Sequence, residues 1–290
     1  MNLTDIHDIR ALLERHGFRF SKSLGQNFLC AGWVPERIAE EALLNPDTGV
    51  LEIGPGIGCL TRELSRRAGK VVSVELDESL MPVLAETLTG CDNVQVVFGD
   101  ILKKDLKALC EEEFLGFARL AVCANLPYNI TTPVLTRLVE SGLFGHITVM
   151  VQREVAARIC ASENTAEYGA FTVLMQWYCE TAPLFDVPPG CFIPAPKVTS
   201  RVIRLDRREA PPCPVRDEGL MFSLVRSAFN QRRKTLSNAL SNGLAGRFGK
   251  EEVAAAIAAV GLDGRIRGEA LSLAQFAALS DALGEREEER

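Results

Sequence analysis

The sequence predicts an α/β fold with a Rossmann-like sheet domain, followed by a smaller all-α domain. Three observations predict it. Short apolar strands alternate with amphipathic helices over residues 50–161. A glycine-rich turn at 54–58 joins the first of these strands to a helix. Beyond residue 217 only helical periodicity remains. Repeated β-α units of this length indicate a parallel sheet with helices on both faces.

The first elements have local reasons. Residues 4–16 carry an apolar helix face, which Thr4 can cap and Gly17 ends. An irregular stretch follows at 20–29, and Pro35 suits the first turn of a helix at 35–44. Strands are then expected at 50–53, 71–75, 94–98, 120–124 and 147–151, alternating with helices that end at Ala68 or cover 78–88, 102–113, 133–140 and 153–161.

The pattern changes after Ala166. A helix is expected at 167–179, a Pro-rich stretch at 185–196 and a strand at 201–205. Three prolines cluster at 211–214, which places the domain boundary there and divides the chain into 1–210 and 211–290. The second domain is expected to hold helices at 217–229, 232–245, 250–260 and 272–283.

Composition excludes several classes of protein. Of the 290 residues 47% are apolar and 24% charged, so the chain is neither disordered nor fibrous. No apolar run approaches the ~20 residues that span a bilayer, and the N-terminus lacks the apolar core of a signal peptide. Nine cysteines without a C-x-x-C pair, beside three histidines, favour reduced thiols and no metal site. We therefore expect a cytoplasmic protein that binds no membrane.

The charge is unevenly distributed. The net charge is −6 and the isoelectric point about 5.3, which alone argues against a nucleic-acid partner. However, the segment 197–234 holds ten Lys or Arg against four Asp or Glu. Such asymmetry can mark a basic face on an acidic body. We expect phosphate contacts from Lys197, Arg226, Arg232, Arg233 and Lys234.

Three strand ends predict a nucleotide-like ligand. Gly54, Gly56 and Gly58 allow a tight turn and close approach to a ligand, although the spacing differs from the dinucleotide fingerprint. The preceding Glu52 favours a cationic ligand over a phosphate. An acid at Glu75 can bond ribose hydroxyls, and Asp100 can accept from an adenine amino group. Successive strand ends line one crevice, so these groups are expected to act together.

The most specific motif is Asn125-Leu126-Pro127-Tyr128, after the fourth strand of this series. An exocyclic amino group of a base is a poor nucleophile, because its lone pair is delocalised into the ring. The Asn125 side-chain oxygen and the Leu126 carbonyl can accept its two N–H groups and favour a more nucleophilic nitrogen. Pro127 fixes the loop, and Tyr128 offers a stacking face.

Together these motifs resemble those of the ribosomal RNA adenine N6-dimethyltransferases of the KsgA family. The resemblance rests on KSLGQNFL at 22–29, the glycine turn, NLPY at 125–128, FIPAPKV at 192–198, FNQRRKTL at 229–236 and RGEALS at 267–272. It implies that S-adenosylmethionine is the methyl donor, with no metal. The resemblance implies donor binding by Asn27, Leu29, Gly54, Glu75, Asp100 and Asn125.

The same resemblance implies the substrate and the partner. Family members modify two adjacent adenines in the 3′-terminal hairpin of small-subunit (16S) rRNA, late in subunit assembly. Phe192 and Tyr128 are then expected to face each other across the target adenine. Ser21 and Ser23 stand where relatives often have basic residues. A monomer acting on an immature small subunit, with 211–290 as its RNA-binding domain, is the expected form.

Other readings remain open from the sequence. An NAD-dependent oxidoreductase is disfavoured by the glycine spacing and the lack of a catalytic His or Tyr-Lys pair in the crevice. A nonenzymatic assembly or transcription factor is disfavoured by the intact loop at 125–128. A methyltransferase acting on DNA adenine or protein glutamine could use a similar loop. A relative that methylates large-subunit rRNA is the nearest alternative.

Overall fold

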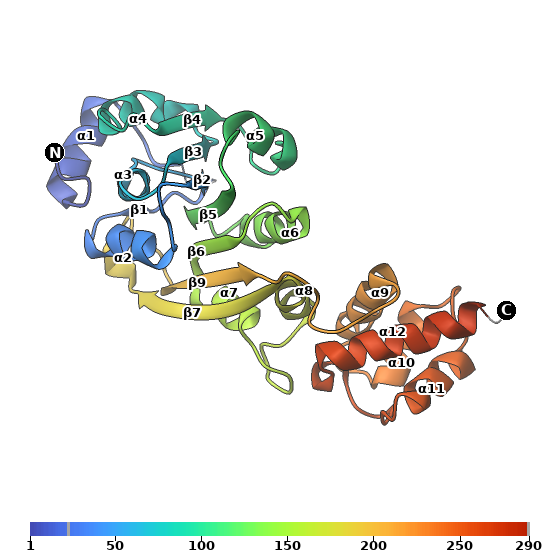
Figure 1. Cartoon of the computed structure of the whole chain (residues 1–290). Helices are drawn as coiled ribbons and strands as arrows, with labels where there is room; N and C mark the ends of the chain where they lie inside the picture. Colours follow the sequence, from blue (N-terminus) through green and yellow to red (C-terminus); the bar gives the residue numbers. More distant parts are fainter. Residues whose placement is uncertain (22–23, 289–290) are drawn as a thin grey trace. The chain divides into compact units, whose positions relative to one another are not determined.

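A computed structural model describes residues 1–21 and 24–288, so Lys22 and Ser23 of the predicted N-terminal motif lie outside the described residues. The chain forms two compact units (Figure 1). The sheet unit comprises Met1–Ala156 and Glu180–Arg207. The helical unit comprises Ala157–Cys179 and Arg208–Arg290. Each unit has its own hydrophobic core.

A seven-stranded mixed sheet forms the sheet unit, in the order β4-β3-β2-β5-β6-β9-β7. The first five strands in this order are parallel to their neighbours, whereas β9 runs antiparallel to β6. The strands of the β-α series are thus parallel, as expected, and the later strand predicted at 201–205 joins them in the antiparallel direction. The strands are β2 (Thr48–Ile53), β3 (Lys70–Glu75), β4 (Val94–Phe98), β5 (Arg119–Asn125), β6 (His146–Gln152), β7 (Cys179–Val187) and β9 (Ser200–Arg207).

The edge strand β7 was not predicted, because Pro183 and the prolines that follow indicate a loop. In an edge strand, however, a proline can occupy a position whose N–H would face solvent, so that no hydrogen bond between strands is lost. A second, two-stranded ribbon was also missed. In it, β1 (Phe28–Leu29) pairs antiparallel with β8 (Phe192–Ile193), so that Leu29 lies opposite Phe192.

Helices cover both faces of the main sheet (Figure 1). On one face, α1 to α4 share a core with the strand residues Val71, Cys123 and Val202. Asp5, rather than the predicted Thr4, caps α1, because its carboxylate accepts the N–H groups of His7 and Asp8. The helices are α1 (Ile6–Arg15), α2 (Trp33–Glu41), α3 (Cys59–Ser65), α4 (Met81–Thr87), α5 (Leu106–Glu113), α6 (Thr131–Ser141) and α7 (Arg153–Ile159).

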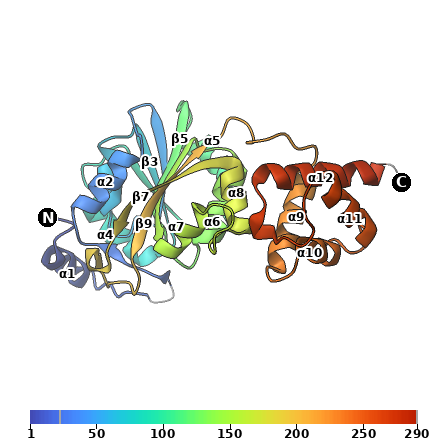
Figure 2. The same ribbon diagram turned by 90° about the horizontal axis from the view of Figure 1, so that it is seen from below.

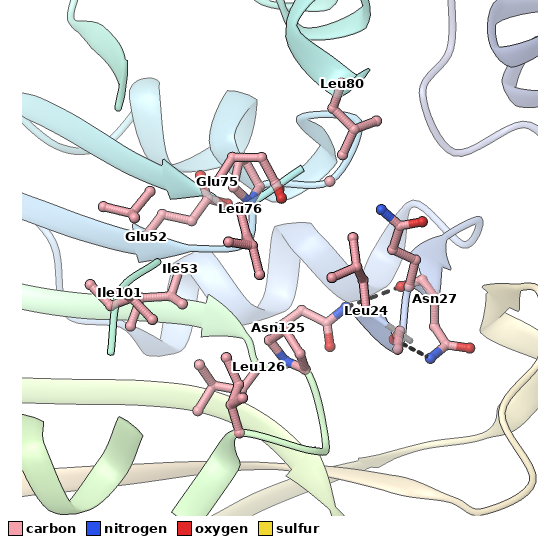
Figure 3. A pocket seen from close by; sticks show the side chains of 18 of the residues that line it. Leu24, Asn27, Glu52, Ile53, Glu75, Leu76, Leu80, Ile101, Asn125 and Leu126 are labelled. Atoms are coloured by element: carbon pink, nitrogen blue, oxygen red, sulfur yellow. Dashed lines mark hydrogen bonds between the residues drawn. The ribbon is translucent and has the colours of Figure 1, made fainter. Parts of the chain in front are cut away.

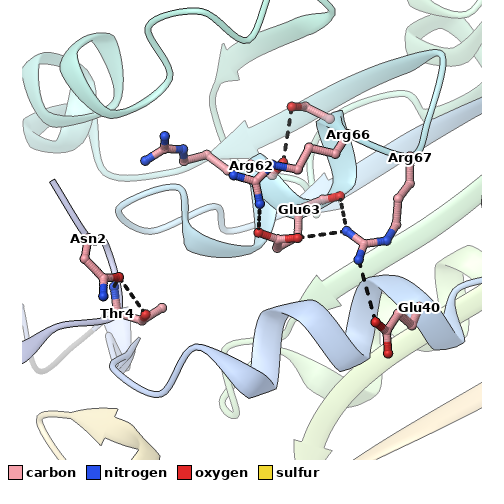
Figure 4. Close-up of polar contacts among 8 residues, drawn as sticks. Asn2, Thr4, Glu40, Arg62, Glu63, Arg66 and Arg67 are labelled. Carbon is pink, nitrogen blue, oxygen red and sulfur yellow. Dashed lines mark hydrogen bonds and ion pairs between the residues drawn. The ribbon is translucent and has the colours of Figure 1, made fainter.

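Ion pairs tie α3 to α2 on that face (Figure 4). Arg67, just beyond the end of α3, bonds Glu63 of α3 at 2.8 Å and lies 3.8 Å from Glu40 of α2. Arg66 also bonds Glu63, whose side chain is only 12% exposed. These contacts hold α3, and with it the glycine turn before it, against α2.

The helical unit packs α8 against the C-terminal helices, which gather around one another in Figure 2. Tyr168 and Trp177 share its core, and the Tyr168 hydroxyl donates to the Leu271 carbonyl at 2.9 Å. Residues 157–179 thus pack with this unit, whereas the sequence division grouped them with the sheet. Its helices are α8 (Ala170–Tyr178), α9 (Glu218–Asn230), α10 (Leu236–Gly243), α11 (Lys250–Ala259) and α12 (Leu273–Glu288).

Among the described residues, no helix is both long and apolar enough to cross a membrane. The same part of the chain holds no cluster of three or more His, Cys, Asp or Glu side chains placed for a metal ion. All nine cysteines lie within it as free thiols, and five of them are buried.

Candidate functional site

A pocket opens at the carboxyl ends of the parallel strands in the sheet unit (Figure 3). It holds about 1080 Å³ of empty space, including its opening to solvent. Four strand ends and the segment before β1 supply its walls, as expected for an open α/β sheet. The lining residues come from 24–29, 52–57, 59–60, 74–76, Leu80, 99–101 and 125–130.

The glycine turn between β2 and α3 forms one wall. Gly54, Gly56 and Gly58 have φ values of +70°, +58° and +88°, which L side chains rarely adopt. A Cβ on Gly56 would lie only 3.0 Å from the Phe28 ring. The Gly54 N–H donates to the Val74 carbonyl at 2.9 Å. The turn therefore needs glycine both for its conformation and for the close packing of β1 against it.

Two carboxylates face the pocket from adjacent strand ends. Glu75 ends β3 with one oxygen accepting the Asp77 N–H at 2.8 Å. Burial raises the pKa of Glu75, although backbone N–H groups of Asp77 and Gly56 counteract it. Asp100 accepts the Leu102 N–H at 2.9 Å and lies 3.6 Å from the Lys103 ammonium. Each acid thus accepts a backbone N–H that shapes its own loop, and the second oxygen of Asp100 is the one near Lys103.

Glu52 lies deeper, at the end of β2, and is 1% exposed. Its Oε2 accepts hydrogen bonds from the hydroxyls of Thr61, at 2.7 Å, and Ser73, at 2.6 Å. Burial nevertheless raises the pKa of Glu52 to about 7, because desolvation outweighs the two hydrogen bonds. This carboxyl therefore titrates near neutral pH at the floor of the pocket.

The loop after β5 presents two hydrogen-bond acceptors to the pocket. The Asn125 side-chain N–H donates to the Asn27 carbonyl at 3.3 Å, which orients the amide (Figure 3). The Leu126 N–H donates to the Met150 carbonyl at 3.1 Å and holds the loop on β6. Among the described residues, none donates to Asn125 Oδ1 or to the Leu126 carbonyl. Both acceptors remain available to a ligand.

The two predicted aromatic residues occupy different positions. Tyr128 lines the pocket, and its hydroxyl bonds the hydroxyl of buried Ser200 at 2.5 Å. Burial raises the pKa of Tyr128. Phe192 instead packs in the sheet-unit core opposite Leu29, is 4% exposed and is not among the residues that line the pocket. The structure therefore brings Tyr128 to the site and leaves Phe192 covered beside it.

Sequence reasoning missed two apolar residues at the site. Leu76 and Ile101 directly follow Glu75 and Asp100, and both line the pocket. Leu76 is 51% exposed, although it is apolar and follows a buried strand. An apolar side chain directly after an acid at a strand end was the signal that could have found them. Apolar walls on this scale suit the flat face of a purine.

The basic residues predicted to bind RNA differ in whether their side chains already have a partner in the protein. Arg232 bonds Glu269 at 2.9 Å and donates to the Ala166 and Thr165 carbonyls. By contrast, no described residue pairs with the side chains of Arg233 or Lys234, which are exposed. Arg226 is also exposed and contacts Ser223 at 3.0 Å. Lys197 is exposed on the sheet unit.

Comparison with known proteins agrees with this site. The family model "Ribosomal RNA adenine dimethylase" matches residues 17–283. The Ribosomal RNA small subunit methyltransferase A of Geobacillus kaustophilus is 48% identical over 94% of both chains, and that of Clostridium perfringens 46% over 98% of both.

Two solved structures have the same fold. The structure of 23S rRNA methyltransferase ErmE is 31% identical, with a TM-score of 0.66 over 89% of this chain and 100% of that chain. A dimethyladenosine transferase from Plasmodium falciparum is 25% identical, with a TM-score of 0.72 over 85% and 94%. These matches confirm the resemblance inferred from the motifs: the chain belongs to the ribosomal RNA adenine dimethylase family.

Proposed function

We propose that this enzyme transfers methyl groups from S-adenosylmethionine to the N6 atoms of two adjacent adenines in the 3′-terminal hairpin of small-subunit (16S) rRNA. The observation that carries the proposal is the pair of unused acceptors, Asn125 Oδ1 and the Leu126 carbonyl, at a nucleoside-sized pocket. The names of the 45–48% identical relatives support the small subunit as the substrate.

The pocket fits S-adenosylmethionine in its polar groups and its shape. The donor supplies a methyl group on a positively charged sulfonium. Glu75 would hold the ribose hydroxyls of the donor, Asp100 would accept from the amino group of its adenine, and Leu76 and Ile101 would supply apolar contacts to that ring. Asn27, Leu29, Gly54 and Asn125 complete the binding set. Glu52 contributes negative potential below the glycine turn whenever it is ionised.

Asn125 and Leu126 act on the N6 amino group of the target adenine in the RNA. Each accepts one N–H, which concentrates the nitrogen lone pair and directs it toward the methyl group. The Asn27 carbonyl keeps the Asn125 amide nitrogen occupied, so that its oxygen faces the substrate. After transfer the nitrogen is cationic and releases a proton readily. This reaction asks for no strong general base, and none lines the loop at 125–130.

Tyr128 supplies a stacking face for the flipped adenine, with its ring held in place by Ser200. Phe192 supplies the second face in this proposal. Because Phe192 is 4% exposed, β8 has to shift for its ring to reach a base. Two aromatic faces then restore the stacking energy that the base loses on leaving the RNA.

We assign RNA contacts to the helical unit, through Arg226, Arg232, Arg233 and Lys234, and to Lys197 on the sheet unit. Of these, Arg233 and Lys234 are exposed and have no side-chain partner among the described residues. The expected partner is an immature small ribosomal subunit, approached by a monomer in the cytoplasm. The helical unit then acts as the RNA-binding domain and the sheet unit as the methyltransferase domain.

One alternative is favoured by a specific observation. The likeness to the structure of 23S rRNA methyltransferase ErmE, at 31% identity, fits an enzyme for large-subunit rRNA. The deciding experiment incubates the protein with labelled S-adenosylmethionine and either immature small subunits or protein-free large-subunit rRNA. Dimethyladenosine at two adjacent positions of 16S rRNA supports the proposal. Label in large-subunit rRNA alone favours the alternative.

A further inference from the structure

An exposed tryptophan lies outside the pocket on the sheet unit. Trp33 begins α2 and is 43% exposed, whereas the other tryptophan, Trp177, is fully buried. The Trp33 ring packs on Phe185 of β7, with centroids 5.9 Å apart. Phe185 is itself 9% exposed and anchored in the core. The indole therefore has a rigid support below it and solvent beside it.

A cation completes this surface. The Arg37 guanidinium lies 4.2 Å from the centre of the same Phe185 ring. Among the described residues, no acid forms an ion pair with Arg37. Two of the acids on α2 are engaged elsewhere: Glu40 pairs with Arg67 (Figure 4), and Glu41 lies 4.0 Å from Arg204. Only Glu36 shares the exposed helix face without a partner among the described residues.

The surface adjoins the candidate active site through the chain. Trp33 follows the pocket-lining segment that ends at Leu29 by four residues. The intervening Cys30 donates its N–H to the Cys191 carbonyl at 2.8 Å, next to Phe192. Phe185 lies on β7, which ends at Val187, shortly before β8 begins at Phe192. Both halves of the surface thus continue directly into the β1–β8 ribbon that borders the pocket.

We propose that Trp33 and Arg37 form a stacking platform for an unpaired rRNA base outside the target pocket. The inference rests on the proposed rRNA substrate. An indole stacks on any base, and a guanidinium beside it contacts the adjoining phosphate, so the platform binds single-stranded RNA without reading its sequence. An unpaired base near the target adenine is the occupant, because a flipped adenine leaves its neighbours unstacked.

The first test measures RNA binding by the full chain. The probe is a transcript of the small-subunit 3′-terminal hairpin with single-stranded flanks. Trp33→Ala should weaken its binding by about 5- to 150-fold, the range that one stacked base supplies. Trp33→Phe keeps an aromatic face and should lose much less. Leu115→Ala, which removes an even more exposed apolar side chain after α5, should bind as the parent does.

Trp33 also serves as its own reporter. The hairpin should quench the fluorescence of Trp33, and this quenching should vanish in Trp33→Phe, because Trp177 is buried in the other unit. Arg37→Gln should weaken binding and reduce the salt slope by about one phosphate contact. Arg119→Gln removes an exposed charge at the start of β5, whose other end lines the pocket, and should leave the slope unchanged. Glu36→Gln should strengthen binding.

The platform is wrong if Trp33→Ala binds the naked hairpin as tightly as the parent does. If the same variant also shows a raised KM on small subunits, the occupant is a ribosomal protein instead. Either result leaves the proposed function intact if the parent still methylates small subunits. Failure of the parent to methylate rRNA contradicts the proposed function instead.

Discussion

The hydroxyl of Tyr128, in the loop after β5, bonds the hydroxyl of Ser200, the first residue of β9, at 2.5 Å. Ser200 is fully buried and lies opposite Gln152 in the antiparallel pair of β9 with β6. The strand predicted at 201–205 thus orients a predicted site residue, through an antiparallel pairing with β6 that the sequence did not predict. In the proposed mechanism, this bond fixes the ring on which the adenine stacks.

Tyr128→Phe and Ser200→Ala test that relationship. Tyr128→Phe keeps the stacking ring and leaves the buried Ser200 hydroxyl without its partner, so it should cost about 1–2 kcal/mol of stability and little turnover. Tyr128→Ala should lose roughly 1–3 kcal/mol of base stacking as well. The measurements are methyl transfer and chemical denaturation of these three variants and of the double variant that combines Tyr128→Phe with Ser200→Ala. Equal damage to turnover by Phe and Ala at position 128 would contradict a stacking role.

Glu75→Ala should weaken binding of S-adenosylmethionine. Removing a charged acceptor from a buried site costs on the order of 2–3 kcal/mol, which corresponds to roughly 30- to 150-fold in affinity. Isothermal titration calorimetry measures this directly. Glu78→Ala, an acid outside the pocket lining at the start of the next helical turn, is the matched control and should bind as the parent does. Parent affinity in Glu75→Ala, with the fold intact, would remove Glu75 from the site.

Glu52 should make stability fall as pH rises toward neutrality. Its pKa is about 7 in the folded protein against an ordinary value of 4.5, so the folded state holds a proton that the unfolded chain releases in this window. The associated stabilisation is present below pH 4.5 and lost by pH 7 and above, on the order of 3 kcal/mol in all. Glu52→Gln should flatten the dependence. Hydrogen exchange of the β2 amides from pH 5 to 8 is the measurement, and identical slopes in both proteins would rule this out.

Lys234→Glu and Arg232→Glu should have different effects, although both reverse a charge in one motif. Lys234→Glu should weaken RNA binding and flatten its salt dependence by about one phosphate contact, with unchanged stability. Arg232→Glu breaks the pair with Glu269 and the bonds to two carbonyls, and should mainly lower the melting temperature of the helical unit. Lys250→Glu, exposed at the start of α11, is the control. A parent salt slope in Lys234→Glu would show that this cation is only solvated.

Strand ends were predictable from the sequence because hydrophobic runs locate strands, and parallel strands present their carboxyl ends at one edge. Glu75, Asp100 and Asn125 accordingly lie around one pocket. Contacts between distant segments were not predictable in this way. The β1–β8 ribbon consists of two strands of two residues each, in which Phe28 pairs with Ile193 and Leu29 with Phe192. Such strands are too short for any periodicity to reveal.

Side-chain networks also lay beyond the sequence. Consecutive basic residues at 232–234 suggested one RNA-binding group, but only the fold shows that Arg232 is tied to Glu269 while Lys234 is free of such a partner among the described residues. Likewise, Phe192 stands in a motif that implies stacking, yet burial against β1 covers it. The type of a residue predicts its chemistry, whereas its neighbours decide whether that chemistry is available.

The most direct test of the proposed mechanism is the turnover of Asn125→Ala. The variant removes an acceptor that acts on the adenine amino group most strongly in the transition state, while the donor is kept saturating and folding is checked by hydrogen exchange. With labelled S-adenosylmethionine and immature small subunits, we expect turnover to fall by on the order of 100-fold or more. Near-parent turnover in a folded Asn125→Ala protein would contradict the account.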